Sequence, residues 1–482
     1  MTAFIRLWAV ACLFNLYAHA DLRGGVDALI LRVAVSGIAA YAALRPAGRP
    51  FVVLAAGYAA LSLSDAPRIN NHGLLMLVVH LYVLGIALRA RVSGATWDEA
   101  FERALAPVLR GSVLVLYGWA VTHKLNTGFL DPVMSCASSE LEKLAALRPF
   151  GISLDALPRG PGAQQATIVG TLLVESAIPL LLFVRRTRPY GAALAVGFHV
   201  TLGLSYPAFS STLWALLGAF LPAQARQALA APEHRPFAPR LAIPLALGCV
   251  PVFVLLWFSR RSSTEDAAVV WSLPFLRHVL LVWTAWLVYR LSGPWARAPR
   301  PARGPAPTVA GALVLALLVL IGLAPYLGLH STRSFAMYSN LYLSGATSNH
   351  LFIPAAWQRI AGREPLVRIR DSSDPVLAAL VEPSWEGAPD NDSFTTFSRP
   401  PLDSILRRPP SWGLPREALR HRIDWLARHG ARGIRLAYEV EGQAYRTEQA
   451  EREPTLNGVS FWQRHFARYR AVPLDQEGLC MW

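Results

Sequence analysis

The stretch of sequence that decides the fold is residues 164–188, QQATIVGTLLVESAIPLLLFVRRTR. Residues 164–184 contain one charged side chain, Glu175, and the stretch ends in the basic turn Arg185-Arg186-Thr187-Arg188. About 20 apolar residues are enough for one helix to cross the hydrocarbon core of a bilayer, and a basic turn marks the cytoplasmic end of such a helix. The stretch therefore predicts a transmembrane helix that carries an ionisable group inside the membrane.

Apolar runs of similar length recur through the first two thirds of the chain. They predict an all-α polytopic membrane bundle of nine to eleven transmembrane helices in residues 1–330, followed by a small α+β extramembrane domain in residues 331–482. The third and eighth runs are short enough to be re-entrant or tilted. The candidate spans are residues 4–20, 26–45, 50–64, 72–89, 105–123, 164–184, 189–206, 209–224, 241–259, 271–292 and 308–328.

The composition agrees with a membrane protein and excludes other classes. Hydrophobic residues make up 53% of the chain and charged residues 16%, whereas soluble proteins carry about 25% charged residues. So few charges also exclude a disordered chain. The net charge is +15, but the basic residues lie between apolar runs, so a nucleic-acid-binding face is not indicated.

The basic residues between the runs also predict the orientation of the chain. With the N-terminus inside, the arginines collect in the even-numbered loops, which are then cytoplasmic. With an odd number of spans, the loop of residues 124–162 and the C-terminal domain are therefore expected outside the cytoplasm. The first run resembles a signal peptide ending at Ala18-His19-Ala20, but we expect it to be retained because Asn15 and Tyr17 are poor residues for such a core.

Residues 331–482 carry the periodicities of a small mixed domain. Residues 367–370 alternate as a strand does, and residues 415–429 have the pattern of a helix. Residues 434–446 predict a hairpin. Residues 383–414, rich in Pro, Ser and Asp, predict a loop.

The four cysteines show no metal-ligand spacing. Cys12 and Cys249 lie in apolar runs and are expected to be small buried hydrophobic residues. Cys136 and Cys480 belong to regions expected outside the cytoplasm. If that compartment is oxidising, we expect these two to form a disulfide.

Lys124 is unusual because this chain otherwise uses Arg. Of 46 basic residues, 44 are Arg, and only Lys124 and Lys143 are Lys. A snorkelling role at the end of the fifth run would suit either residue type. Arg stays charged, however, whereas a desolvated Lys can lose its proton and act as a base. The choice of Lys indicates a functional Lys124, whereas Lys143 is expected on the solvated face of a loop helix.

Other ionisable groups in the apolar runs are candidates because such groups are costly inside a membrane. Asn71 and His72 open the fourth run and either lie at headgroup level or orient a substrate. Pro179 frees the backbone carbonyl of Glu175 from its helical partner, which favours a polar pocket. His199 has either a packing or a binding role. No zinc-hydrolase motif, phosphate-binding loop or nucleophile elbow accompanies them.

Several short motifs follow one another in a recognisable order and spacing. They are Asn70-Asn71-His72, Lys124-Leu125 with Phe129-Leu130, Ser176-Ala177, Phe198-His199, Ala324-Pro325-Tyr326 and Phe335-Ala336-Met337-Tyr338-Ser339-Asn340. In this order they resemble vitamin K-dependent γ-glutamyl carboxylase and its wider family of bacterial relatives, the HTTM (horizontally transferred transmembrane) family. The resemblance covers roughly residues 1–370.

The resemblance implies a membrane enzyme. Lys124 corresponds to the lysine that deprotonates reduced vitamin K, and His72 to a histidine of the family's NNH motif. The implied cofactor is reduced vitamin K or a related isoprenoid hydroquinone, used with O2 and CO2 to carboxylate a glutamate of a protein or peptide on the extracytoplasmic side of a bacterial inner membrane. The residues implied to bind substrate or quinone are Asn71, His123, Glu175 and His199.

Two departures from the carboxylase pattern keep other functions open. Only about 150 residues follow the last span, whereas the carboxylase has a larger lumenal part, and the partner of the family's lysine is His123 here. The alternatives are a related enzyme with another substrate, a non-catalytic membrane scaffold, and a proton-coupled transporter that uses Lys124, Glu175 and His199 as a relay. Convergence of these side chains on one apolar cavity would favour an enzyme, and a water-filled path would favour transport.

Overall fold

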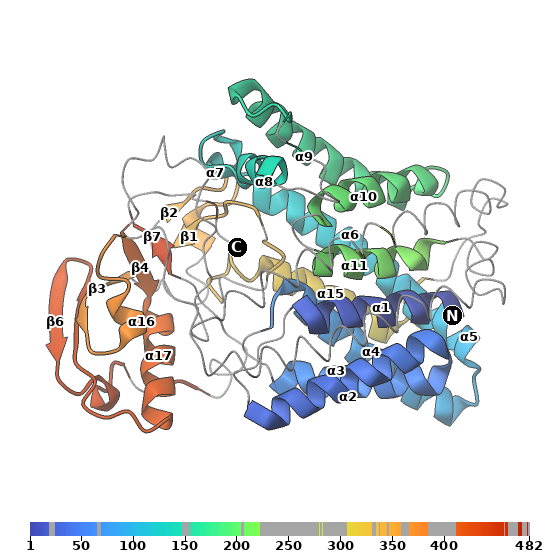
Figure 1. The fold of residues 1–482 in the computed structure, drawn as a ribbon, viewed down its shortest axis with the longest axis horizontal. Helices are drawn as coiled ribbons and strands as arrows, with labels where there is room; N and C mark the ends of the chain where they lie inside the picture. The colour runs from blue at the N-terminus through green and yellow to red at the C-terminus, as the bar shows by residue number, and fades with distance from the viewer. Residues whose placement is uncertain are drawn as a thin grey trace.

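The structure is a computed structural model in which helices form one part and an antiparallel sheet the other (Figure 1). The helices pack along one another, and the sheet with its covering helix α17 lies at one end of them. The residues that the structure describes are 1–18, 25–64, 69–146, 154, 156–203, 207–221, 279, 282, 306–329, 334–336, 338–344, 347–357, 366–383, 411–456, 458–460, 471–474 and 480.

Most described residues are helical. The helices are α1 (Thr2–Ala18), α2 (Gly25–Leu44), α3 (Gly48–Ser64), α4 (Asn71–Ser93), α5 (Trp97–Ala100), η1 (Phe101–Leu105), α6 (Ala106–Lys124), α7 (Thr127–Leu130), α8 (Cys136–Ala146), α9 (Pro161–Phe183), α10 (Arg188–Gly203), α11 (Pro207–Leu217), η3 (Gly218–Phe220), α15 (Val309–Leu323), α16 (Pro375–Ala378), α17 (Arg416–Arg428) and η6 (Ala450–Arg452). The π-helical turn η1 joins α5 to α6 without a break.

Three helices are long and apolar enough to cross a membrane: Asn71–Ser93, Trp97–Lys124 and Pro161–Phe183. They coincide with the predicted spans 72–89, 105–123 and 164–184. Six other predicted spans also fall on helices, but these helices are shorter. The predicted spans 241–259 and 271–292 lie outside the described residues, apart from positions 279 and 282.

Local sequence signals fix where α4 begins and ends. The side chain of Asn70 accepts a hydrogen bond of 2.7 Å from the backbone N–H of Gly73, as expected of an N-cap. Gly94 ends the helix in the left-handed region with φ 69°, which glycine adopts without steric cost. These two caps place Asn71 and His72 in the first turn.

The central helix α6 packs against α9, α11 and α15. Small residues allow α15 to come close to it. A Cβ added to Gly322 would lie 2.1 Å from the indole ring of Trp119, and one added to Gly111 would lie 2.6 Å from Leu315. This close contact fixes the position of α6 along its axis relative to α15. It thereby also fixes the position of Lys124, the last residue of α6.

The C-terminal region contains a five-stranded antiparallel sheet in the order β6-β5-β3-β4-β7. Buried side chains of the sheet and of α17, among them Trp412, Leu419 and Ile423, form a core separate from that of the long helices. The strands are β1 (Leu343–Ser344), β2 (Thr347–Ser348), β3 (Leu366–Ser372), β4 (Trp412–Pro415), β5 (Leu436–Val440), β6 (Gln443–Thr447) and β7 (Val472–Pro473).

Three predictions for this region are confirmed, and one is wrong. The strand β3, the helix α17 and the hairpin β5–β6 lie where the sequence places them. Most of the predicted loop 383–414 lies outside the described residues. Its last three residues, 412–414, are wrongly predicted, because they belong to β4, which pairs with β3 and β7. The partners of β4 are far away in the sequence, so its Gly- and Pro-containing residues give no local strand signal.

Candidate functional site

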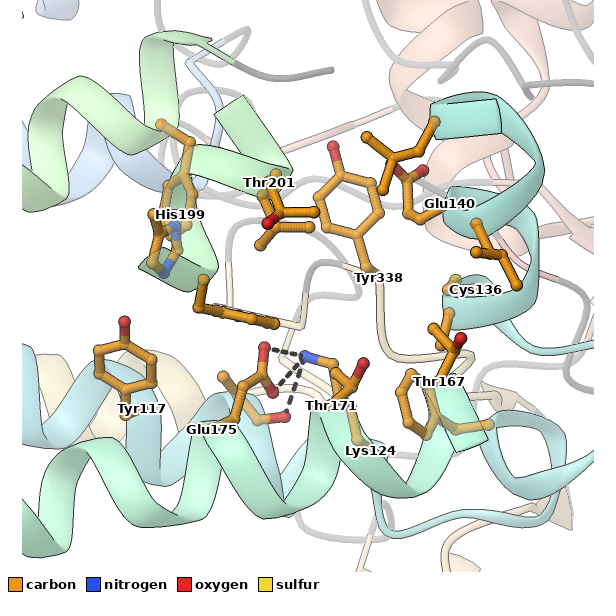
Figure 2. Close-up of a pocket in the computed structure, with 18 of the residues that line it drawn as sticks. Tyr117, Lys124, Cys136, Glu140, Thr167, Thr171, Glu175, His199, Thr201 and Tyr338 are labelled. Atoms are coloured by element: carbon orange, nitrogen blue, oxygen red, sulfur yellow. Dashed lines mark hydrogen bonds and ion pairs between the residues drawn. The ribbon is translucent and has the colours of Figure 1, made fainter. Parts of the chain in front are cut away.

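A cavity of about 330 Å³ lies between α6, α8, α9 and α10, at the first turn of α4 (Figure 2). Most of its wall is apolar, with Leu116, Phe198 and Phe209 among the lining side chains. Asn71, His72, Lys124, Glu175 and His199 also line it. Five of the six residues that the sequence predicts for the site therefore meet in one apolar cavity.

Lys124 and Glu175 form a buried ion pair across α6 and α9. The Nζ of Lys124 lies 2.8 Å from Oε2 of Glu175 and donates a hydrogen bond of 3.1 Å to Oε1. Only 4% of the Lys124 side chain and 8% of the Glu175 side chain are exposed. Lys124 therefore does not snorkel to an interface, and its ammonium group faces the cavity.

Other neighbours complete the surroundings of Lys124. Its Nζ donates a hydrogen bond of 3.4 Å to the carbonyl of Ala120 and lies 5.8 Å from the centre of the Phe129 ring. That distance is within the range of a cation–π contact. The amine is thus held by one carboxylate, one carbonyl and one aromatic face.

His72 and His199 both contact the ring of Phe209. Their ring centres are 6.0 Å and 5.3 Å from the centre of the Phe209 ring, and both imidazoles are buried. Asn71, in contrast, accepts a hydrogen bond of 2.8 Å through Oδ1 from the backbone N–H of Phe335. Asn71 therefore holds a wall of the cavity in place.

His123, which the resemblance implies as a substrate- or quinone-binding residue, is not among the residues that line the cavity. One ring nitrogen lies 2.8 Å from the hydroxyl of Tyr326 and the other 3.0 Å from the carbonyl of Ser334. Consecutive residues on a helix point about 100° apart, so Lys124 and His123 cannot face the same space. His123 anchors the segment that follows α15.

A strained segment after α15 forms one wall of the cavity. Phe335, Tyr338 and Asn340 have φ values of 63°, 53° and 55°, in a region that costs about 1–3 kcal/mol for residues with a Cβ. Phe335 and Tyr338 both line the cavity. The motif that suggested the resemblance thus contributes two aromatic rings to the wall.

Hydrogen bonds hold this segment against the end of α6. The side chain of Asn126 donates hydrogen bonds to the carbonyls of His123 at 2.7 Å and Ser339 at 2.5 Å. The side chain of Asn340 accepts a bond of 2.7 Å from the backbone N–H of Cys136. The segment is therefore fixed to the end of α6 and to the start of α8.

Cys136 and Cys480 form a disulfide, which confirms the pairing expected from the sequence. Cys136 lines the cavity, and Phe129 and Ile168 pack around the bridge. The C-terminal end of the chain is therefore attached to the cavity wall. Cys12 is buried and reduced, as expected.

Lys143 is less exposed than the sequence suggests. It lies 3.0 Å from Glu140, and 25% of its side chain is exposed. Burial lowers the pKa of Lys143, an effect that the carboxylate of Glu140 opposes. Glu140 itself lines the cavity, so each lysine of this chain is paired with a glutamate of the cavity wall.

Sequence reasoning missed Tyr117, Glu140 and Tyr338 as residues of the cavity wall. Tyr117 precedes Lys124 by seven residues, two turns on the same face of a helix, and this spacing could have found it. Among the described residues, no group of three or more metal-ligating side chains is present. No family model, curated protein or solved structure compared with this chain matches it.

Proposed function

We propose that this chain is an integral membrane enzyme of the polytopic type, whose cavity binds a reduced isoprenoid quinone and which carboxylates a glutamate side chain of a protein or peptide. The observation that carries the proposal is the buried pair of Lys124 and Glu175 in the wall of one apolar cavity. The resemblance to vitamin K-dependent γ-glutamyl carboxylase and the HTTM family supplies the reaction.

The cavity residues fit a hydroquinone. A volume of about 330 Å³ is at the lower end of the range for small-molecule sites, which are mostly apolar with a few convergent polar groups. The apolar side chains suit an aromatic ring and the start of an isoprenoid tail. A phenolic hydroxyl among these side chains needs a polar partner, and the Lys124–Glu175 pair supplies one.

The pair can accept a proton without leaving a lone buried charge. Transfer of the Lys124 proton to Glu175 gives a neutral amine beside a neutral carboxyl group, so the transfer creates no net charge in the apolar wall. The neutral amine can then take a proton from a bound hydroxyl and stabilise the remaining oxygen as an ammonium. A bound reduced quinone supplies, with O2, the energy for fixing CO2.

The same proposal includes the orientation in the membrane. A disulfide persists in an oxidising compartment, so the bridge between Cys136 and Cys480 supports an extracytoplasmic position for α8 and the C-terminal domain. In a bacterium this would be the outer side of the inner membrane. A protein or peptide substrate would then reach the site from that side.

A first experiment identifies the ligand. The full chain is purified with native lipids in nanodiscs, and the bound isoprenoids are identified by mass spectrometry. We expect a quinone or quinol to be enriched over its share in the surrounding membrane, and less of it in a Lys124→Met variant. Equal quinone content in protein-loaded and empty nanodiscs would contradict the proposal.

A second experiment tests Lys124 as a base. Arg preserves the charge but does not give up its proton. Lys124→Arg should therefore lower the rates of quinol oxidation and of labelled CO2 fixation by at least about 100-fold, the low end of what acid–base catalysis contributes. Lys143→Arg is the matched control because it changes the chain's other lysine, and it should retain activity. Wild-type turnover in Lys124→Arg at normal expression would exclude the proton-transfer role.

A further inference from the structure

A short loop that follows β2, residues 351–357, exposes large apolar side chains. Its sequence, LFIPAAW, carries no charge. The side chains of Leu351, Phe352 and Trp357 are 44%, 74% and 47% exposed. Exposed apolar side chains that gather in one place indicate a surface that contacts a membrane or another molecule.

His350 holds this loop in a defined shape. Its Nδ1 accepts hydrogen bonds of 3.1 Å and 3.0 Å from the backbone N–H groups of Phe352 and Ile353. Its Nε2 donates a hydrogen bond of 2.9 Å to the carbonyl of Thr122, so one neutral tautomer makes all three bonds. The hydroxyl of Ser348 donates a further bond of 2.9 Å to the carbonyl of Ile353. The apolar side chains are therefore exposed on an ordered loop.

The loop is attached to the end of α6, which fixes its level along that helix. The backbone N–H of Leu351 donates a hydrogen bond of 2.9 Å to the carbonyl of Leu125, and Asn126 and His350 form an isolated antiparallel bridge. Leu125 lies roughly 16 Å along the helix axis from the centre of the predicted span 105–123. Half the hydrocarbon core of a bilayer is about 15 Å thick. For a helix close to the membrane normal, the loop is thus level with the boundary between acyl chains and headgroups.

We propose that residues 351–357 form an interfacial anchor, in which Leu351, Phe352 and Trp357 enter the lipid leaflet at the end of α6. Trp is enriched at this level of membrane proteins because its ring is apolar and its N–H can still reach a polar partner. An uncharged loop enters the boundary without desolvating an ionic side chain. The inference rests on the membrane-spanning part of the proposed function and is independent of its chemistry.

Spin labels on introduced cysteines measure the depth of the loop. The full chain, with Cys12→Ser and Cys249→Ser and with its disulfide intact, is labelled at Phe352→Cys or at Ala356→Cys. Both positions are exposed, so a label fits at either, and the smaller Ala356 serves as a second site in the same loop. The protein is reconstituted alone into vesicles of phosphatidylcholine and phosphatidylglycerol.

Two reference positions define the ends of the depth scale. Leu317→Cys is the lipid reference, since Leu317 is 47% exposed near the centre of the predicted span 308–328. Tyr445→Cys is the water reference, since Tyr445 is an exposed aromatic residue of β6 in the C-terminal sheet. Power-saturation electron paramagnetic resonance gives the collision rates of each label with O2, which concentrates in acyl chains, and with a water-soluble nickel chelate.

The ratio of the O2 to the nickel collision rate separates the outcomes. For both loop labels we expect a ratio severalfold higher than at Tyr445→Cys and lower than at Leu317→Cys. Loop ratios equal to that of Tyr445→Cys would overturn the anchor and leave the membrane-spanning part of the proposed function standing. A low ratio at Leu317→Cys as well would overturn both. Loop labels that collide slowly with both reagents would show that a second copy of the chain covers the loop, which also overturns the anchor.

Discussion

Lys124 and Glu175 depend on each other in the apolar wall of the cavity. A single charge moved from water into such surroundings costs several kcal/mol, and a close counter-charge repays most of that cost only while both groups are present. The described contacts of Lys124 give it one carboxylate partner, Glu175. Loss of either member therefore leaves a charge that the cavity wall does not compensate.

We predict that Glu175→Leu destabilises the protein by about 3–5 kcal/mol, the cost of an uncompensated buried charge. The double variant Glu175→Leu/Lys124→Met replaces both charges with apolar groups and should recover most of this loss. Thermal unfolding of the three proteins in nanodiscs measures the effect. A double variant as unstable as Glu175→Leu would show that the pair does not act as a unit.

At the residue scale, the sequence identifies the ionisable side chains of the cavity and misses side chains of types that are common in apolar helices. Lys124 is conspicuous because a lysine is rare in this chain, and Glu175 because it interrupts an apolar run. Their contact with each other is not predictable, since Lys124 and Glu175 are 51 residues apart in the sequence and lie on different helices. Tyr117 carries no signal of its own, because a tyrosine in an apolar helix is unremarkable.

At the element scale, helices are predictable because their signal is local. The apolar run predicted at 164–184 begins and ends within a few residues of α9 (Pro161–Phe183), and α4, with its N-cap Asn70, begins one residue before the predicted span 72–89. The strand β4 depends on β3 and β7, and its paired residues are about 50 positions away in β3 and about 60 positions away in β7. Pairing of that kind leaves no pattern within four residues.

The hairpin β5–β6 is fixed to η6 by one side chain. Glu451 accepts hydrogen bonds of 2.8 Å and 3.1 Å from the backbone N–H groups of Gly433 and Ile434. Burial raises the pKa of Glu451. The two hydrogen bonds, a third from its own backbone N–H and the charge of Arg452 lower the pKa by more than burial raises it, so the net shift is downward. The folded state therefore favours the carboxylate.

A lowered pKa in the folded state gives a definite sign to the pH dependence. The stabilisation from Glu451 is complete above the ordinary glutamate pKa of about 4.3 and is lost as the pH falls through the lower folded value. We predict that Glu451→Gln reduces the protection of the Gly433 and Ile434 amides from hydrogen exchange at pH 6. In the wild type this protection should be greater at pH 6 than at pH 4, and in Glu451→Gln the difference in protection between the two pH values should be smaller.

The control for this prediction is Glu441→Gln, which changes an exposed glutamate in the turn of the same hairpin. It should leave the protection of both amides unchanged at either pH, after correction for the intrinsic exchange rate. Equal effects of Glu441→Gln and Glu451→Gln would mean that overall charge, and not the two hydrogen bonds, controls the exchange.

At the scale of the whole molecule, one covalent bond joins the end of the chain to the cavity. The disulfide between Cys136 and Cys480 connects positions 344 residues apart, and the side chain of Cys136 is part of the cavity wall. The helical part and the C-terminal domain have separate hydrophobic cores. The bridge therefore limits how far the C-terminal end can move from the site.

We predict that the double variant Cys136→Ser/Cys480→Ser lowers the stability of the full chain by about 2–4 kcal/mol, because a bridge that closes a long loop removes much of the freedom of the unfolded chain. Alkylation of the denatured wild type before reduction should label Cys12 and Cys249, the two cysteines outside the predicted bridge, and leave Cys136 and Cys480 blocked. Reduction should then expose Cys136 and Cys480. Cys12→Ala, which removes the buried reduced thiol, is the control, and its unfolding should remain sensitive to reductant.

If reductant lowers the unfolding temperature of the Cys136→Ser/Cys480→Ser variant as much as that of the wild type, the stabilisation comes from elsewhere. If instead only proteins with the bridge respond, the attachment of the C-terminal end to the cavity wall stabilises the whole molecule.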